Sequence, residues 1–427
     1  MTEELLNFGF APAGSSVIKV LGVGGAGCNA VNHMFNEGIQ GVDFIICNTD
    51  AQALQTSPVS VKIQLGVTLT EGRGAGNLPE HGEQAAIENM QDVRAVLEGT
   101  TKMLFITAGM GGGTGTGAAP VIARLARELE ILTIAVVTIP SPAEGKRRFQ
   151  QAIEGVNRLK GYVDSMLVIS NEKLQTIYGN LPASQAFKKA DDIIKTAVKG
   201  VAEIITVHGN INIDFADVDT VMAGSEVFIM GTGIADGEDR AMKAVYLALE
   251  SPLLDSNDIY GTKDILLNII SGDDEITMGE IGDIIEYLQE KAGQDANIIW
   301  GNGVDRKLGK KISVTIIATR FNKNPNSLLQ PKPSVQEFVL GNNFEPEINI
   351  EEELSDQVAD NFFEPAGVDE KKHGGKRTRS AASGYKKKAG KPAPEQKKEM
   401  GANTDSWFLR QFNRFFDDQD DKDQKLE

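Results

Sequence analysis

Short apolar runs alternate with amphipathic stretches between residue 16 and about residue 206. The apolar runs have the length and composition of buried strands, and they span residues 17–21, 42–47, 61–65, 103–107, 132–139 and 166–169. Between or after them lie helical patterns over residues 118–129, 145–162 and 183–205. Strands that alternate with helices predict an α/β fold: a doubly wound, mostly parallel sheet with helices on both faces.

A different pattern follows the last and longest of these helical stretches. Residues 207–322 contain expected strands at 227–230, 265–270, 298–300 and 312–319, but only two strong helical patterns, at 240–249 and 278–291. This arrangement predicts a second, smaller mixed α/β domain. The expected organisation is a flexible N-terminal segment (1–15), a first domain (16–182), a central connecting helix (183–206) and a C-terminal α/β domain (207–322).

Beyond residue 322 the hydrophobic periodicity fades, and the polar, proline-interrupted composition predicts a disordered linker over 323–404. Its charges fall into an acidic block at 351–370 and a basic block at 371–398. Residues 405–427 regain a pattern, with Phe408, Leu409, Phe412, Phe415 and Phe416 on one helical face. An isolated helix this short is marginal in water, so we expect this peptide to fold against a partner.

Composition narrows the class of protein. The formal net charge of -17 argues against nonspecific nucleic-acid binding, because phosphate backbones demand a cationic surface. Cys28 and Cys47 do not have the spacing of a disulfide framework or a zinc site. The N-terminus lacks a basic segment followed by an apolar core, and no run reaches the roughly 18 apolar residues of a membrane span. We therefore expect a cytoplasmic protein.

A glycine-rich loop, Gly22 to Gly27, follows the first expected strand and opens a helix. Glycines there let the backbone approach a phosphate, while helix-terminal N–H groups supply positive potential. The loop could also be a tight strand-to-helix turn without a ligand. Asp50, at the end of the next strand, would suit a ribose, so an NAD-linked oxidoreductase is a rival hypothesis at this point.

A second glycine-rich loop separates these hypotheses, because a dinucleotide fold has no use for it. Six glycines occur in nine residues from Gly109 to Gly117, and turn formation alone does not justify that number. Two such loops at the carboxyl ends of strands in one sheet would form one phosphate cradle at the sheet's switch point. Thr114 and Thr116 could add hydroxyl donors. The chain has no Gly-x-x-x-x-Gly-Lys-Ser/Thr sequence, so we expect backbone amides, helix dipoles and Mg²⁺ to meet the phosphate charge.

The run Gly-Gly-Gly-Thr-Gly-Thr-Gly resembles the signature loop of the tubulin and FtsZ superfamily, and Asn-Thr-Asp-Ala-Gln-Ala-Leu at 48–54 is typical of FtsZ rather than tubulin. The resemblance runs from about Val17 to Phe321. It implies that residues 16–182 form a GTP-binding domain. The implied GTP or GDP contacts are Gly24, Gly25, Ala26, Asn29, Asp50, Gly74, Ala75, Gly76, Gly111, Gly112, Gly113, Thr114, Gly115, Thr116 and Gly117.

The same resemblance assigns individual roles around the nucleotide. It places residues 72–77 at the γ-phosphate, Glu144 on the ribose and Arg148 near the sugar or phosphates. It makes Asn171 and Asp191 the guanine readers, with Phe187 stacked on the base. An Asp carboxylate accepts two hydrogen bonds from the N1 and N2 edge of guanine, which adenine does not offer. Without the family, these groups would be a surface turn, a charged helix start and a solvated helix charge.

Residues 212–217, at the start of the second domain, resemble the family's synergy loop, which enters the nucleotide pocket of the adjoining subunit. There Asp214 and Asp217 orient or polarise the attacking water, and Asn212 assists them. The alternative is helix capping by Asp214. The resemblance thus implies a GTPase that polymerises head to tail into filaments of the cell-division ring, with catalysis completed in trans.

The sequence leaves two alternative functions open. An oxidoreductase is disfavoured because no plausible catalytic His or Lys lies near the second glycine loop. A nucleotide-gated scaffold with little turnover is disfavoured by the carboxylates of Asp214 and Asp217. The resemblance also implies that the C-terminal peptide binds membrane-tethering division proteins such as FtsA, because the run at 408–410 is similar to the core of that peptide. The membrane is then a partner only indirectly. The aromatic extension through Phe416 and the acidic run at 417–421 depart from the family pattern. The alternative to partner binding is that this helix docks on the chain's own folded domain.

Overall fold

A computed structural model of the chain describes residues 16–207, 209, 211–250 and 259–322. All of them belong to one compact unit, Met1–Lys332. The expectations for residues 1–15, 323–404 and 405–427 lie outside the described residues.

The first sheet is entirely parallel and has the order β3-β2-β1-β4-β5-β6. Its strands are β1 (Ile18–Val23), β2 (Asp43–Asn48), β3 (Val61–Gln64), β4 (Met103–Gly109), β5 (Leu132–Ile139) and β6 (Ser165–Ser170). The chain moves outward from β1 to β3 and then returns to the other side of β1 with β4. In such sheets ligands bind beyond the carboxyl ends of the strands at this reversal, here between β1 and β4.

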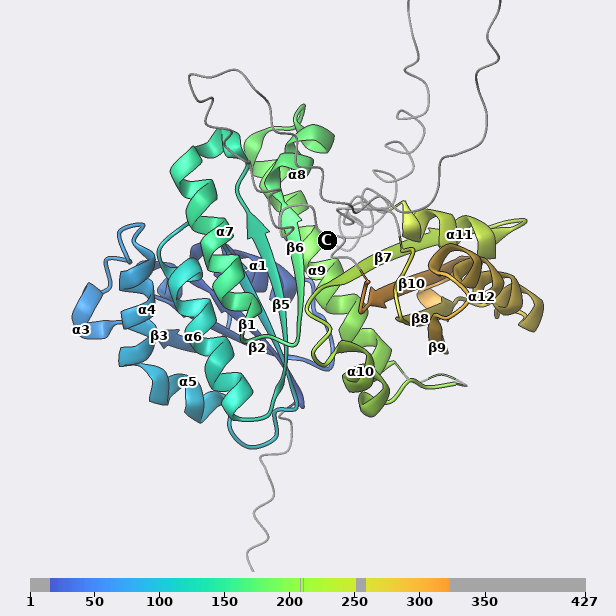
Figure 1. The fold of residues 1–427 in the computed structure, drawn as a ribbon, viewed down its shortest axis with the longest axis horizontal. Helices are drawn as coiled ribbons and strands as arrows, with labels where there is room; N and C mark the ends of the chain where they lie inside the picture. The colour runs from blue at the N-terminus through green and yellow to red at the C-terminus, as the bar shows by residue number, and fades with distance from the viewer. Residues whose placement is uncertain (1–15, 208, 210, 251–258, 323–427) are drawn as a thin grey trace, which may run out of the picture. The chain divides into compact units, whose positions relative to one another are not determined.

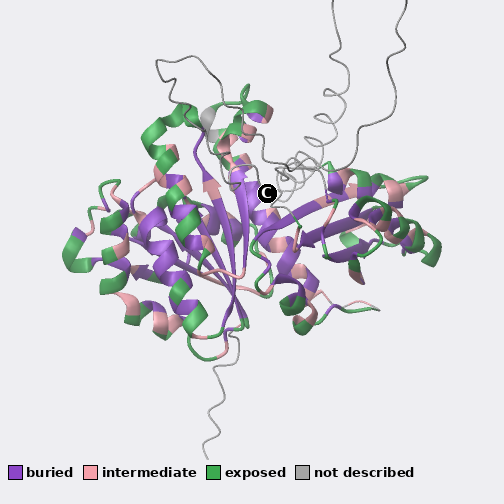
Figure 2. Ribbon diagram, viewed as in Figure 1, coloured by how far each residue is buried: buried purple, intermediate pink, exposed green. Residues whose placement is uncertain are grey.

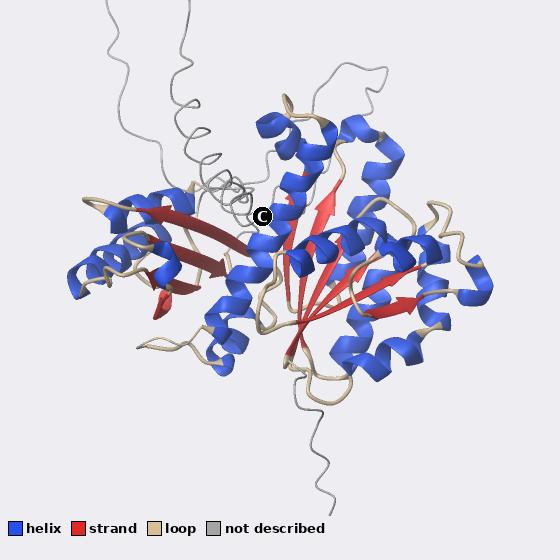
Figure 3. Cartoon of the chain, turned by 180° about the vertical axis from the view of Figure 1, so that it is seen from behind, coloured by secondary structure: helices blue, strands red, loops and turns tan. Residues whose placement is uncertain are grey.

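Helices cover both faces of this sheet (Figures 1 and 3). The helices α4 to α7 pack on one another along one face, and α1 packs with α9 on the other. The helices in this part of the chain are α1 (Gly24–Asn36), α2 (Ala51–Thr56), α3 (Val67–Thr70), α4 (Pro79–Glu88), α5 (Met90–Leu97), α6 (Thr114–Glu128), the 3-10 helix η1 (Pro142–Glu144), α7 (Lys146–Lys160), α8 (Asn171–Tyr178) and α9 (Ala183–Thr206). The predicted doubly wound α/β fold is confirmed.

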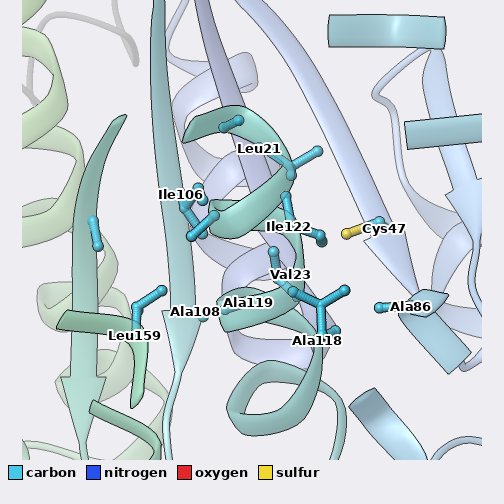
Figure 4. Close-up of a cluster of buried hydrophobic side chains, with 14 of the residues drawn as sticks. Leu21, Val23, Cys47, Ala86, Ile106, Ala108, Ala118, Ala119, Ile122 and Leu159 are labelled. Atoms are coloured by element: carbon cyan, nitrogen blue, oxygen red, sulfur yellow. The ribbon is translucent and has the colours of Figure 1, made fainter. Parts of the chain in front are cut away.

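The core of this layer lies between the sheet and α6. Figure 2 shows the strands buried and the outer sides of the helices exposed. Figure 4 shows part of the cluster, with residues of α6 among those of β1 and β4: Ala118, Ala119, Ile122, Leu21, Val23, Ile106 and Ala108. Small residues on α6 let it approach the sheet closely, which fixes where its N-terminus points.

The second sheet is mixed, with the order β7-β10-β8-β9. The strands are β7 (Phe228–Ala235), β8 (Asp264–Ser271), β9 (Asn297–Val304) and β10 (Ile312–Thr319); β10 runs antiparallel to β7 and β8, and β8 runs parallel to β9. Two helices, α11 (Arg240–Leu249) and α12 (Met278–Ala292), share its core. The expected mixed α/β region is confirmed, with two further elements, α10 (Phe215–Met222) and η2 (Arg306–Leu308).

The helix α9 contacts elements of both sheets. It packs against α1 and β5, and a Cβ on Gly200 would lie 2.0 Å from Met230 Cε of β7 and 3.4 Å from Thr315 Cγ2 of β10. The absence of a side chain at residue 200 therefore lets the helix lie close to the second sheet.

The structure differs from the sequence-based elements mainly in the helices. The predicted start of α6 at residue 118 is wrong, because the helix begins at Thr114, inside the glycine loop. Gly115 and Gly117 are poor helix formers, but tertiary contacts override that propensity. The sequence-based elements also omitted α4 and α5, which have only ten and eight residues.

Candidate nucleotide-binding site

The loops selected from the sequence gather at the carboxyl edge of the first sheet. They follow β1 (from Gly24), β2 (from Thr49), β4 (through Gly117), β5 (from Ser141) and β6 (from Asn171). Because all six strands are parallel, these loops emerge from the same edge.

The two glycine loops are in direct contact. A Cβ on Gly24, whose φ is +71°, would lie 2.9 Å from the amide nitrogen of Gly115, and a Cβ on Gly115 would lie 2.5 Å from the carbonyl oxygen of Gly109. Real Cβ atoms do not approach backbone atoms this closely. The backbones of the two loops therefore meet only because both positions are glycine.

Close packing also accounts for other glycines of the second loop. Cβ atoms on Gly111, Gly113 and Gly117 would lie 2.7 Å from Arg148 O, 2.8 Å from Ala75 Cβ and 1.9 Å from Pro79 O, respectively. The abundance of glycine here thus has a packing cause that the sequence analysis underrated. Gly25 has no such neighbour within 4 Å, and Gly112 has only Asn77 Oδ1, at 4.0 Å. Gly25 and Gly112 are the positions where open space adjoins the backbone.

Two helices begin at this edge without a side-chain cap. The N-cap positions are Val23 for α1 and Gly113 for α6, and neither provides a side-chain hydrogen bond to the first turn. The first N–H groups of a helix have no partner within it and carry the positive end of its dipole. Two uncapped N-termini beside open glycines form a site suited to an anion such as phosphate.

Hydroxyl groups organise the cradle. Thr116 Oγ1 accepts a hydrogen bond from the amide of Gly111 at 2.8 Å and is buried, so it fixes the loop. Thr114 Oγ1 lies 2.7 Å from Thr49 Oγ1, which ties the start of α6 to the end of β2. Thr49 was not among the residues expected at the site, although it lies within the 48–54 motif.

Asp50 and the loop 72–77 are held together next to this cradle. Asp50 Oδ1 caps α2 by accepting from the amides of Gln52 and Ala53, at 2.9 and 3.2 Å. The amide of Ala51 donates to Gly72 O at 3.1 Å, and that of Gly74 donates to Thr49 O at 3.2 Å. Gly74 and Gly76 have positive φ values of +87° and +60° and no neighbour for a Cβ within 4 Å. The loop is anchored at its start and open along its middle.

Three residues assigned to the sugar and base form one network at the adjoining loop. Glu144 Oε1 accepts from the amide of Ser141 at 3.0 Å and from Asn171 Nδ2 at 3.1 Å. Arg148 Nη1 lies 3.6 Å from Glu144 Oε2. Glu144 is thus part of the capping box of η1, with Ser141 as the other member. This capping role fixes the carboxylate whether or not a nucleotide is present.

Asp191 and Phe187 are one turn apart on α9, so they lie on the same face of the helix. Phe187 is 62% exposed, which is unusual for an aromatic side chain of this size. Desolvation by burial raises the pKa of Asp191 to about 6. His33 opposes this rise, and the charge of Asp192 adds to it. A desolvated carboxylate beside an exposed ring has the chemistry of a base-binding site.

The carboxylates of the 212–217 stretch are engaged in helix capping. Asp214 Oδ1 accepts from the amide of Asp217 at 2.9 Å, and Asp217 Oδ2 accepts from the amide of Asp214 at 3.0 Å. Together they form the capping box of α10. Asn212 Oδ1 accepts from the amide of Gly209 at 2.6 Å. The capping alternative is therefore realised, and each carboxylate keeps one oxygen outside the box.

Ala26 and Asn29 are exposed on the first turns of α1, next to Gly25. Burial raises the pKa of both cysteines, that of Cys28 to about 12. Within the described part of the chain, no helix is long and apolar enough to cross a membrane.

The parallel sheet with two uncapped helix N-termini at its reversal defines a nucleotide-binding protein. Comparison with known proteins gives the family. Residues 17–179 match the Tubulin/FtsZ family, GTPase domain, and residues 226–322 match the FtsZ family, C-terminal domain. The chain belongs to the FtsZ family, and it is a GTPase that binds GTP and GDP.

Individual relatives agree. The chain is 47% identical over 325 residues to the cell division protein FtsZ of Porphyromonas gingivalis, covering 75% of this chain and 71% of that protein. It is 48% identical over 308 residues to FtsZ of Pseudomonas aeruginosa, covering 72% and 78%. A solved FtsZ dimer from M. jannaschii aligns with a TM-score of 0.66 at 42% identity, covering 72% of this chain and 88% of that one.

Substitution by alanine should have different effects at Gly25, which adjoins open space, and at Gly117, which is closely packed. We expect Gly25→Ala to keep or raise the melting temperature, because it lies in a helix with free space around it, but to weaken GDP binding about tenfold or more by blocking close approach to a phosphate. Gly117→Ala should lower the melting temperature by several degrees, because its Cβ would clash with Pro79 O. Thermal melts and GDP titration measure these effects in the two variants. Wild-type GDP affinity in Gly25→Ala would contradict the assignment of a phosphate site at this glycine.

Asp191→Asn should stabilise the nucleotide-free protein while weakening GDP binding. Because the folded-state pKa is raised from 3.8 to about 6, the ionised carboxylate destabilises the fold above pH 6. We expect the variant to gain on the order of 1–2 kcal/mol in free energy of unfolding at pH 7, and the gain to disappear as pH falls toward 4. Urea unfolding at both pH values measures this. A variant that is less stable at pH 7 would show that the carboxylate is not strained.

Proposed function

We propose that this GTPase acts in cell division by polymerising head to tail into filaments, and that each junction between subunits completes one hydrolytic site. The relatives from P. gingivalis and P. aeruginosa are named cell division proteins, and the M. jannaschii structure is a dimer. The observation that carries the proposal is the separation of chemistry within the chain. The phosphate cradle adjoins the first sheet, whereas the exposed Asp214 and the half-buried Asp217 open α10, which precedes the second sheet.

One half of the site binds the nucleotide. The phosphates lie against the N-termini of α1 and α6, where Gly25 and Gly112 allow the backbone to approach. The loop 72–77 contacts the γ-phosphate through its open glycines. Glu144 binds the ribose, and Arg148 lies near the sugar or phosphates.

The base is recognised from α8 and α9. Asn171 and Asp191 hydrogen-bond to guanine, and Phe187 stacks on the ring. The ionised Asp191 carboxylate accepts from N1 and N2 of guanine, and with adenine it would be left buried without donors. Its desolvation strengthens this discrimination, because unpaired buried charge costs more than exposed charge.

The other half of the site positions water. The capping box uses Asp214 Oδ1 and Asp217 Oδ2, which leaves Asp214 Oδ2 and Asp217 Oδ1 for a water molecule in the pocket of the adjoining subunit. Asn212 assists at the same loop. Phosphoryl transfer needs mainly orientation and charge stabilisation, so two held carboxylates are enough to accelerate it.

A Mg²⁺ ion fits this chemistry as a hard cation that takes oxygen ligands from phosphates, waters and a few side chains. Asp50 keeps Oδ2 outside its capping interaction, and the half-buried side chain of Thr114 lies at the same edge. These are the groups that would hold the ion with GTP. When bound, it would neutralise charge on the transferring phosphoryl group.

The proposal extends to partners outside the described residues. Residues 405–427 would bind membrane-tethering division proteins such as FtsA, which would bring the cytoplasmic filament to the division site. The membrane would then be contacted only through those partners.

Variants that keep the capping box but remove charge test the catalytic half. Asn accepts the same backbone hydrogen bonds as Asp, so Asp214→Asn and Asp217→Asn should fold normally and bind GTP within about twofold of wild type. Their GTP turnover should fall by about 100-fold or more, because the water is no longer held by a carboxylate. Asp219→Asn, an exposed acid of the same helix, is the matched control and should hydrolyse GTP normally.

Mixing distinguishes catalysis in trans from catalysis within one subunit. At a GTP concentration that leaves the phosphate-loop variant Gly25→Ala largely unoccupied, its mixture with Asp217→Asn should be more active than either variant alone, since some junctions pair one sound nucleotide site with one sound carboxylate pair. Full activity in the Asn variants would support a different catalytic group, and loss of GTP binding in them would show that the carboxylates belong to the nucleotide pocket.

A further inference from the structure

A buried cluster of charged side chains joins α1 to α9, outside the residues assigned to the nucleotide. His33 Nε2 lies 2.7 Å from Asp192 Oδ1, and the two side chains are 13% and 10% exposed. Lys195 Nζ lies 3.4 Å from the same carboxylate oxygen, and Lys189 Nζ lies 3.8 Å from Oδ2. Lys195 also reaches Glu37 Oε2, at 3.5 Å, just beyond the end of α1.

The cluster joins the two helices that the proposed function places at opposite ends of the nucleotide. The helix α1 begins at Gly24, in the phosphate cradle, and α9 carries Asp191 immediately before Asp192. Successive residues of a helix point about 100° apart, so fixing Asp192 against α1 fixes the rotation of α9 and with it the direction of Asp191. One buried pair therefore links the helix at the phosphates to the helix at the base.

We propose that His33 and Asp192, supported by Lys195, are positioning residues for guanine recognition, which hold α9 in register with α1 and balance the charge beside Asp191. This inference rests on the proposed role of Asp191 as a guanine reader. It assigns to the pair no contact with the nucleotide itself.

The hydrogen bond has a defined direction. Burial alone would raise the pKa of Asp192, but the hydrogen bond from His33 and the charges of Lys195, His33 and Lys189 together lower it. The carboxylate is therefore ionised and only accepts, so the Nε2–H of His33 donates. An ionised Asp192 without these partners would be a buried, unpaired charge next to a second carboxylate.

The charges beside Asp191 oppose one another. Asp192 disfavours ionisation of Asp191, and His33 favours it. The other charged groups of the cluster are Lys189 and Lys195 on α9 and Glu37 after α1, while α8 contributes the hydroxyl of Tyr178, whose pKa is raised by burial and by Asp192. Removing either member of the pair must therefore shift the ionisation of Asp191, and the two removals must shift it in opposite directions.

The test measures GDP and inosine diphosphate affinity from pH 5 to 8 in the full chain. Inosine lacks the N2 amine, so the affinity ratio reports recognition by Asp191. In wild type, GDP affinity should fall as pH drops through about 6, because a protonated carboxyl no longer accepts two hydrogen bonds. His33→Gln, which still donates to Asp192, should move this midpoint upward by roughly 0.5–1 pH unit, and Asp192→Asn should move it downward by a similar amount.

Further variants separate positioning from general stability. Both single variants should lower the GDP to inosine diphosphate affinity ratio at pH 7.5 at least threefold, and the double variant should return the midpoint toward wild type. Lys199→Gln removes an exposed lysine that pairs with Glu203 on the same helix, and it should change neither the midpoint nor the ratio.

The outcomes distinguish this inference from the function on which it rests. Midpoints that stay fixed, or that move in the same direction in His33→Gln and Asp192→Asn, would overturn the inference while leaving the guanine site intact. Equal GDP affinity in wild type and Asp191→Asn would instead remove the guanine assignment itself.

Discussion

The direct approach of two backbone loops is the constraint on which the site depends. Gly24 meets Gly115, and Gly117 meets Pro79, at distances that no side chain allows. These contacts fix the N-termini of α1 and α6 side by side at the reversal of the parallel sheet. Because neither terminus has a side-chain cap, their N–H groups and dipoles are left for an anion. Under the proposed function, phosphate therefore binds to the backbone amides and helix dipoles at this edge of the sheet.

The base side of the site depends on a different interaction. Asp191 is held in a desolvated position with its pKa raised, whereas the adjacent Asp192 is paired with His33 and Lys195 and has a lowered pKa. The pKa values of these two consecutive carboxylates of one helix are thus shifted in opposite directions. The unfavourable state of Asp191 is a cost to the free protein that a guanine would relieve, which is the usual relation between strain and binding.

Much of the fold could be predicted from the sequence, because strand signals are local. The predicted bounds of β5, β10 and α11 agree with the structure, and the other strands differ by a few residues at their ends. The start of α6 could not be predicted, since contacts with α4 stabilise a helical turn that Gly115 and Gly117 disfavour. The site loops were found because glycine density and family motifs are visible in the chain. The Thr49–Thr114 and His33–Asp192 pairs were not, because their members are far apart in sequence and only folding brings them together.

The central claim is that the hydrolytic site is complete only where two subunits meet. Its most direct test is the rate of GTP hydrolysis per molecule, measured over a wide range of protein concentration at saturating GTP. The rate per molecule should be very low at high dilution, rise with concentration as junctions form and then level off. A rate per molecule that stays constant down to dilute, demonstrably monomeric protein would contradict it.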